Sequence, residues 1–270
     1  MELTIELIII FMLLGAGVGF LAGLLGIGGG AYMVPILTFL LVARGIPNES
    51  AMHIALGTSM ASIVFTTLSS MLAQQKRGGV IWSVVWQMTP GVVLGVLVSS
   101  FVASKTNSFY LAIIFTVFMS YVAYTMFRNK KPKPTRTLLP PKWLFASGGG
   151  IGIIAGLVSI AGGALTVPFL IWQNIDVKKA IGTSSAVGFF LTIAGAIGYM
   201  VNGSLSQNLY ELNYAVGYVY LPAVFFVSIV SFFTAKLGVR LVYTLPVGII
   251  KKIFGLLSIA LSLRMLYSVL

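Results

Sequence analysis

One pattern occurs twice in this chain and limits what it can fold into: a cluster of glycines inside an apolar stretch. The first copy is GLLGIGGGAYMVP at residues 23–35, and the second is GLVSIAGGALTVP at residues 156–168. When residues 15–37 are aligned with residues 148–170, 13 of 23 positions are identical. Agreement of this extent indicates an internal duplication.

A glycine cluster in an apolar helix frees backbone groups from the helical hydrogen-bond ladder. Lipid tolerates such a break only where it is buried in protein or lines a cavity. We therefore expect the breaks at residues 26–30 and 159–163 to face each other at one central site. The alternative is that glycines only allow helices to cross closely. That alternative suits the regularly spaced glycines that precede each break, which are Gly15, Gly19, Gly23, Gly148, Gly152 and Gly156.

Composition places the chain in a membrane. Hydrophobic residues make up 58% of the 270 residues and charged residues 8%, whereas soluble domains have roughly 25% charged residues. The net charge of +12 lies in short loops between apolar segments, so positive-inside topology explains it better than a nucleic-acid partner. The absence of cysteine excludes disulfides and cysteine metal sites. We expect a multi-pass cell-membrane protein that contacts lipid and needs no cofactor.

The apolar segments predict an all-α polytopic membrane protein with one transmembrane domain. The expected organisation is a first repeat at 1–127, a basic, proline-rich linker at 128–142 and a second repeat at 143–270. The expected helices cover 5–25, 31–43, 51–73, 80–103 and 108–127, then 143–158, 164–173, 180–201, 215–235 and 245–267. The segment 31–43 is roughly 20 Å long as a helix, too short for a hydrocarbon core of about 30 Å.

The basic residues decide how the broken stretches run. If each stretch crossed the membrane once, nine basic residues would lie on one side and eight on the other. If each is a hairpin that returns to its own side, 14 lie on one side, and only Arg44, Lys105 and Arg264 on the other. The second split is a strong positive-inside signal. It predicts a cytoplasmic linker and both termini outside.

Each half is then a glycine-broken hairpin plus three transmembrane helices, and the second half is inverted relative to the first. Inverted repeats with broken helices and a midplane site are typical of secondary transporters. The first turns of the two short helices carry unpaired N–H groups and roughly half a positive charge each. They predict an anion site without a basic side chain. Its expected substrate contacts are Gly28, Gly29, Gly30, Ala31, Gly162, Gly163 and Ala164.

A second motif is also duplicated, as ALGTSMA at 55–61 and AIGTSSA at 180–186. Its hydroxyl groups would donate to an oxyanion or offer oxygens to a coupling cation. The alternative is that they bond to the carbonyls of the preceding turn or hold helices together. The candidate side chains are Thr58, Ser59, Thr183, Ser184 and Ser185.

Catalytic and metal-binding residues are not expected. The chain has one histidine, His53, and a lone histidine is more often structural than functional. No acidic residue lies in the middle of an expected span, so a carboxylate proton relay has no candidate. A membrane-embedded enzyme is therefore the weakest reading of the chain.

Both glycine motifs, each with its following Val-Pro, and both Gly-Thr-Ser motifs resemble those of the TauE/SafE family of sulfite and organosulfonate transporters. The second copy departs from the triple glycine, with Ser159 and Ala161 in place of Gly26 and Gly28. The resemblance implies a secondary transporter of small anions such as sulfite or sulfonates, working by alternating access. A passive anion channel is the alternative. The substrate, the coupling ion (proton or sodium) and the direction stay open, as does a homodimer, which exposed glycine stripes would permit.

Overall fold

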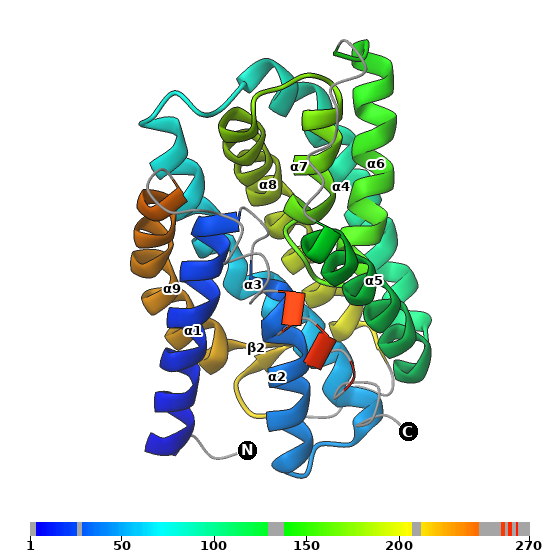
Figure 1. The fold of residues 1–270 in the computed structure, drawn as a ribbon. Coiled ribbons are helices and arrows are strands. Elements are labelled where there is room, and N and C mark those ends of the chain that lie inside the picture. Colours follow the sequence, from blue (N-terminus) through cyan, green and yellow to red (C-terminus); the bar gives the residue numbers. More distant parts are fainter. Residues whose placement is uncertain are drawn as a thin grey trace.

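A computed structural model describes residues 4–25, 29–128, 138–206 and 212–242, with residues 255, 256, 259, 260 and 263. The described chain is an elongated bundle of helices (Figure 1). The first half contains α1 (Ile5–Leu25), α2 (Gly30–Ala43), α3 (Asn48–Gln75), α4 (Trp82–Lys105) and α5 (Ser108–Arg128). The second contains α6 (Pro141–Leu157), α7 (Gly163–Trp172), α8 (Val177–Ser204), β1 (Ala215–Val216), β2 (Val219–Tyr220) and α9 (Leu221–Val242).

Six of the described helices are long and apolar enough to cross a membrane, namely α1, α3, α4, α5, α8 and α9. The helices α2 and α7 are shorter, with 14 and 10 residues. The chain is thus an all-α, multi-pass membrane protein, as its composition predicts. The expected helix at 245–267 lies almost wholly outside the described residues.

One expected helix boundary is wrong. The segment from residue 215 was expected to be helical, but Ala215 pairs with Tyr220 and Val216 with Val219 in a two-stranded antiparallel hairpin. Gly217 makes the turn with φ of 55°, a conformation that side chains with a Cβ rarely adopt. The apolar pattern continues through the strands, so hydropathy alone placed the helix start too early.

Each glycine-broken stretch returns to the end of the bundle where it starts. The Arg44 guanidinium, just after α2, lies 3.4 Å from the carboxylate of Glu6 in the first turn of α1. At the other end, the Leu139 N–H before α6 donates to the side-chain oxygen of Gln173 after α7, at 2.9 Å. Both stretches are therefore hairpins. They open at opposite ends of the bundle (Figure 1), while the inverted relation of the two halves stays an interpretation.

The long arm of each hairpin packs on a helix of the other half, α1 on α9 and α6 on α4. A methyl group added at Gly15 would lie 2.6 Å from the Val227 carbonyl oxygen, and one at Gly148 would lie 2.5 Å from that of Met88. Backbones this close leave no room for a side chain, so only glycine fits at these positions. The same close approach recurs at Gly19, Gly23 and Gly152, whereas a methyl group at Gly156 would overlap the Ser99 side chain of α4. The close-crossing interpretation of these glycines is confirmed.

This packing corrects one expectation about partners. The regularly spaced glycines were expected to be exposed and therefore available to a second copy of the chain. They are instead occupied by α9 and α4 of the same chain. A homodimer stays a prediction, but the glycine stripes do not support it.

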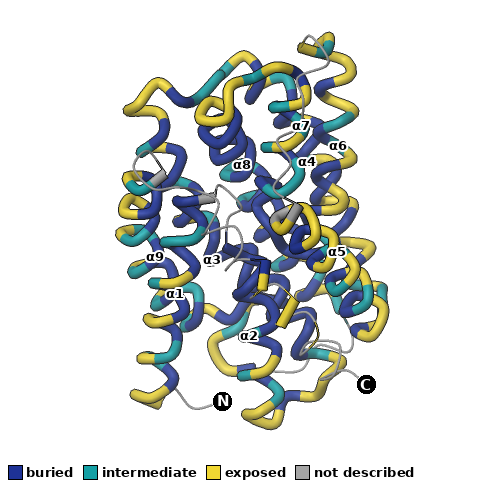
Figure 2. Tube along the Cα trace, viewed as in Figure 1, coloured by how far each residue is buried: buried dark blue, intermediate teal, exposed yellow. Residues whose placement is uncertain are grey.

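The helices α3 and α8 occupy the centre and are buried along most of their length (Figure 2). Local sequence fixes where they begin. Asp176 caps α8, where its carboxylate accepts from the Lys178 N–H at 2.9 Å, a good helix start. Pro47 precedes α3, and its carbonyl accepts from the Ala51 N–H at 2.9 Å. These starts set which residues of α3 and α8 reach the centre.

Candidate functional site

Glycines in left-handed backbone conformation start both short helices. Gly29 precedes α2 with φ of 72° and Gly162 precedes α7 with φ of 74°, and neither helix has a side-chain cap. Glycine adopts this conformation without the Cβ clash that other residues meet. Neither set of first-turn N–H groups is thus capped by a side chain, and anion binding there stays a prediction. Gly28 lies outside the described residues.

The two hairpin tips contact each other, and α2 and α7 both begin at about the middle of the bundle (Figure 1). A methyl group on Gly30 of the first tip would overlap the carbonyl oxygen of Ser159 in the second. The same methyl would lie 3.3 Å from Ile63 of α3. The Ser159 hydroxyl in turn donates to the Leu56 carbonyl of α3 at 2.6 Å. The two glycine motifs, which lie 133 residues apart in the sequence, thus meet against α3.

The predicted tip residues are closely packed. The buried ones are Gly29, Gly30, Ala31, Gly162 and Gly163, and Ala164 is half-buried. Thr166, in the first turn of α7, is buried with its hydroxyl unpaired among the described residues. Sequence reasoning missed this hydroxyl, although it lies inside the duplicated motif. The signal was its contrast with Met33, which holds the matching position in the first copy.

The Gly-Thr pairs have a structural role that the sequence did not reveal. The Thr58 hydroxyl accepts from the Tyr220 N–H at 2.9 Å, just before α9, and the Thr183 hydroxyl accepts from the Ile81 N–H at 3.0 Å, just before α4. The preceding glycines give these loops room, since a methyl on Gly57 would overlap the carbonyl of Tyr218. Each pair therefore holds the loop that leads into a helix of the other half.

The serines of the same motifs differ from one another. The hydroxyls of Ser184 and Ser185 both donate to the Ile181 carbonyl at 3.0 Å, which is the alternative expected from the sequence, bonding to the preceding turn. The Ser59 hydroxyl is fully buried and has no partner among the described residues. Thr58 and Thr183 use their hydroxyls only as acceptors in the bonds above, so they keep an O–H donor, as Ser59 does.

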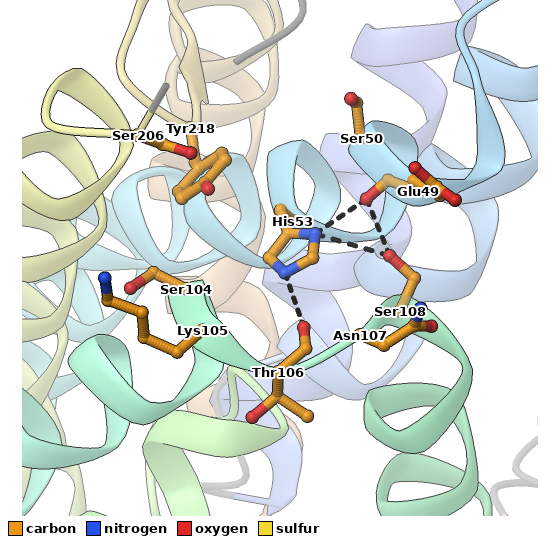
Figure 3. Close-up of a pocket in the computed structure, with 10 residues that line it drawn as sticks. All are labelled: Glu49, Ser50, His53, Ser104, Lys105, Thr106, Asn107, Ser108, Ser206 and Tyr218. Atoms are coloured by element: carbon orange, nitrogen blue, oxygen red, sulfur yellow. Dashed lines mark hydrogen bonds between the residues drawn. The ribbon is translucent and has the colours of Figure 1, made fainter. Parts of the chain in front are cut away.

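A polar pocket of about 280 Å³ lies near the start of α3, beside the α4–α5 turn (Figure 3). His53 lines it, with Nδ1 2.7 Å from the Glu49 carbonyl and Nε2 3.1 Å from the Thr106 carbonyl. The imidazole also stacks on Tyr218, with ring centroids 5.2 Å apart. His53 thus joins the first turn of α3 to the end of α4, which favours the structural interpretation. Lys105 and Glu49 both line this pocket, so it has no single sign of charge.

Comparison with known proteins identifies the family of the chain. The family model described as "Sulfite exporter TauE/SafE" matches residues 11–265. The chain belongs to the TauE/SafE family. A "Probable membrane transporter protein" of Haemophilus influenzae is 38% identical, over 96% of this chain and 97% of that protein. The "Probable membrane transporter protein YunE" of Bacillus subtilis is 27% identical, over 96% of this chain and 97% of its own. No solved structure matches.

Membership of the TauE/SafE family and these relatives indicate a membrane transporter. The part of the chain that the structure describes also contains no group of three His, Asp or Glu side chains that could hold a metal ion. The pair of hairpin tips, with backbone amides and neutral hydroxyls as its chemical groups, stays the candidate centre of this TauE/SafE protein.

The Thr58→Val variant tests the structural role of the Gly-Thr pair. Valine has a similar shape but no acceptor, so the buried Tyr220 N–H loses its partner. We expect the free energy of unfolding to fall by about 1–3 kcal/mol, measured by denaturant titration in detergent. Thr58→Ser, which keeps the acceptor, should lose less than half as much. Equal losses in the two variants would show that packing of the methyl, not the hydrogen bond, holds the loop.

Proposed function

We propose that this protein is a secondary transporter of small anions, with sulfur oxyanions or organosulfonates as substrates. The observation that carries the proposal is the contact between two hairpin tips, each starting a helix from a left-handed glycine. The substrate would lie between the first turns of α2 and α7. Gly28, Gly29, Gly30, Ala31, Gly162, Gly163 and Ala164 would supply the backbone N–H groups.

Electrostatics supports an anion over a cation at this place. Each helix N-terminus carries roughly half a positive charge, and the contact between Gly30 and Ser159 brings together the two tips that lead into α2 and α7. Their effect is strong because the surrounding side chains are neutral and buried. The unpaired hydroxyls of Ser59 and Thr166 are available as further donors. An oxyanion with several oxygens suits a ring of donors from different elements.

Alternating access would follow from how the halves interlock. The hairpin arms α1 and α6 each pack on a helix of the opposite half, so rocking of one half would move both tips together. The family supports export or import of a small anion, and a proton or sodium ion is proposed as the coupling ion. We further propose a cell-membrane location with a cytoplasmic linker at 128–142 and both termini outside, from the positive-inside bias.

The first test is thermal unfolding of the detergent-purified protein with sulfite, methanesulfonate, sulfate and chloride, each with and without sodium. A ligand at 100 times its Kd stabilises the folded state by about 2.7 kcal/mol. We expect a rise in Tm with sulfite or methanesulfonate and none with chloride. A rise that needs sodium would identify the coupling ion. Unchanged Tm with every anion at millimolar concentration would overturn the anion site.

A variant pair locates the binding. Thr166→Val removes the unpaired hydroxyl in the first turn of α7. We expect the affinity for the stabilising anion to fall about tenfold, because one lost hydrogen bond costs about 1.4 kcal/mol. Thr38→Val is the matched control, since Thr38 is equally buried in α2 and its hydroxyl already donates to the Val34 carbonyl at 2.9 Å.

Accumulation of the anion against its gradient in vesicles would exclude a passive channel.

A further inference from the structure

We propose that one face of α3 lines the passage along which the anion moves between the paired tips and the upper end of the bundle in Figure 1. This inference rests on the proposed transport function. The face is formed by Ser59, Thr66 and Ser70. Their spacings of seven and four residues place the three side chains in one line along a helix with 3.6 residues per turn.

Between residues 58 and 74, the polar side chains of α3 lie on its interior side. Phe65 is 46% exposed and Leu72 is 44% exposed, so these residues mark the lipid-facing side. The interior side contains a series of hydroxyl and amide groups in which every member is at most 3% exposed. They are Thr58, Ser59, Ser62, Thr66, Thr67, Ser69, Ser70 and Gln74. A helix that only had to be buried would be apolar on this side as well.

Hydrogen bonds between helices explain part of this series. Thr66 donates to the Ser231 hydroxyl of α9 at 2.7 Å, and the Thr67 hydroxyl lies 3.3 Å from that of Thr192 on α8. Such pairs hold helices together in membranes. Thr66 also shows that α9 supplies the opposite wall of the line, through Ser231. This interface is closed in the structure.

Contacts between helices do not explain why Ser59 and Ser70 are buried. Both are buried, with exposed fractions of 0% and 3%, and neither hydroxyl has a hydrogen-bond partner among the described residues. A buried hydroxyl without a partner destabilises the fold. Water or an anion reaching these groups in another conformation would satisfy them. The two unpaired groups lie at the two ends of the same line, which is where a passage would load and unload its ligand.

The charge at the upper end of this line favours an anion. Four basic side chains are exposed there on the end of α3 and on α9: Lys76, Arg77, Lys236 and Arg240. Arg77 also donates to the Val239 carbonyl of α9 at 3.4 Å, so the two helices meet at this end. The acidic side chain described at the same end is Asp176, which caps α8. Neutral hydroxyls along the line would let an anion pass without trapping it. A buried cationic side chain would instead hold the anion too tightly to release it.

The chain has no cysteine, so single cysteines report on the passage without background. Ser59→Cys, Thr66→Cys and Ser70→Cys are reconstituted as full chains in lipid vesicles. Each is treated with anionic 2-sulfonatoethyl methanethiosulfonate or with its cationic trimethylammonium analogue. The control is Ser99→Cys, since Ser99 is equally buried but its hydroxyl already donates to the Val96 carbonyl at 2.9 Å. Modification is followed by intact mass, with rates divided by those of a free thiol.

We expect the three cysteines on α3 to react at least tenfold faster than the control, and faster with the anionic reagent than with the cationic one. Rates equal to the control would overturn the passage, and faster reaction with the cationic reagent would overturn its anion selectivity. If Thr66→Cys folds poorly, Ser70→Cys decides, because its hydroxyl has no bond to lose. Labelling needs no transport, so labelled cysteines without anion stabilisation would count against the proposed substrate and not against the passage.

Discussion

Sulfite flux into vesicles should fall by a factor of about 5 to 150 when Gly30 is replaced by alanine. The added methyl group would overlap the Ser159 carbonyl of the opposite tip, so the two tips must separate. Overpacking of this kind costs about 1–3 kcal/mol. If the whole cost falls on the state that binds the anion, this free energy corresponds to the factor of about 5 to 150 in flux. Flux of labelled sulfite in proteoliposomes measures the change.

The control for this prediction is Gly17→Ala on the other arm of the same hairpin, where an added methyl group would meet nothing within 4 Å. Alanine is a better helix former than glycine in both positions, so propensity alone would raise the stability of both variants. Wild-type flux in Gly30→Ala would show that the tips need not touch for transport, and would remove them as the substrate site.

Gly152→Leu should cause the largest loss of fold stability among the substitutions that we propose. A methyl group at this position would already overlap the Val92 carbonyl of α4, and leucine would force α6 and α4 apart. Overpacking of about 3 kcal/mol corresponds to a fall in Tm of about 6–12 °C for a chain of this size. Thermal unfolding in detergent, followed by circular dichroism, measures it.

Gly150→Leu is the matched control, because Gly150 lies on the same helix and an added methyl group there meets nothing within 4 Å. Its Tm should stay within about 2 °C of the wild-type value, since surface changes are usually within about 0.5 kcal/mol. Equal falls in the two variants would mean that α6 does not depend on its close approach to α4.

The large features of the fold could be predicted from the sequence because they depend on local pattern. Apolar length predicts the spans, since lipid requires each to satisfy its own backbone. The asymmetry of the basic residues predicts that the broken stretches are hairpins, and the ion pair between Arg44 and Glu6 agrees with this. The glycine clusters place the breaks within a residue or two of where α2 and α7 begin, at Gly30 and Gly163.

The candidate site could be predicted only in part. The tips and their glycines follow from a motif that is contiguous in the sequence. The roles of the hydroxyls do not, because they depend on which helix lies opposite. Thr58 and Thr183 hold loops that lie 162 and 102 residues away in the chain. The strands before α9 were also missed, since their apolar residues continue the hydropathy of the following helix.

The sequence by itself determined that the chain is an all-α membrane protein with two glycine-broken hairpins, because hydropathy, charge and backbone freedom act over a few neighbouring residues. Only the tertiary structure decided which groups meet. It packs α1 on α9 and α6 on α4, brings Gly30 against Ser159, and leaves the hydroxyls of Ser59, Ser70 and Thr166 unpaired among the described residues. Contacts between distant segments depend on how helices pack in three dimensions, and no local pattern encodes them.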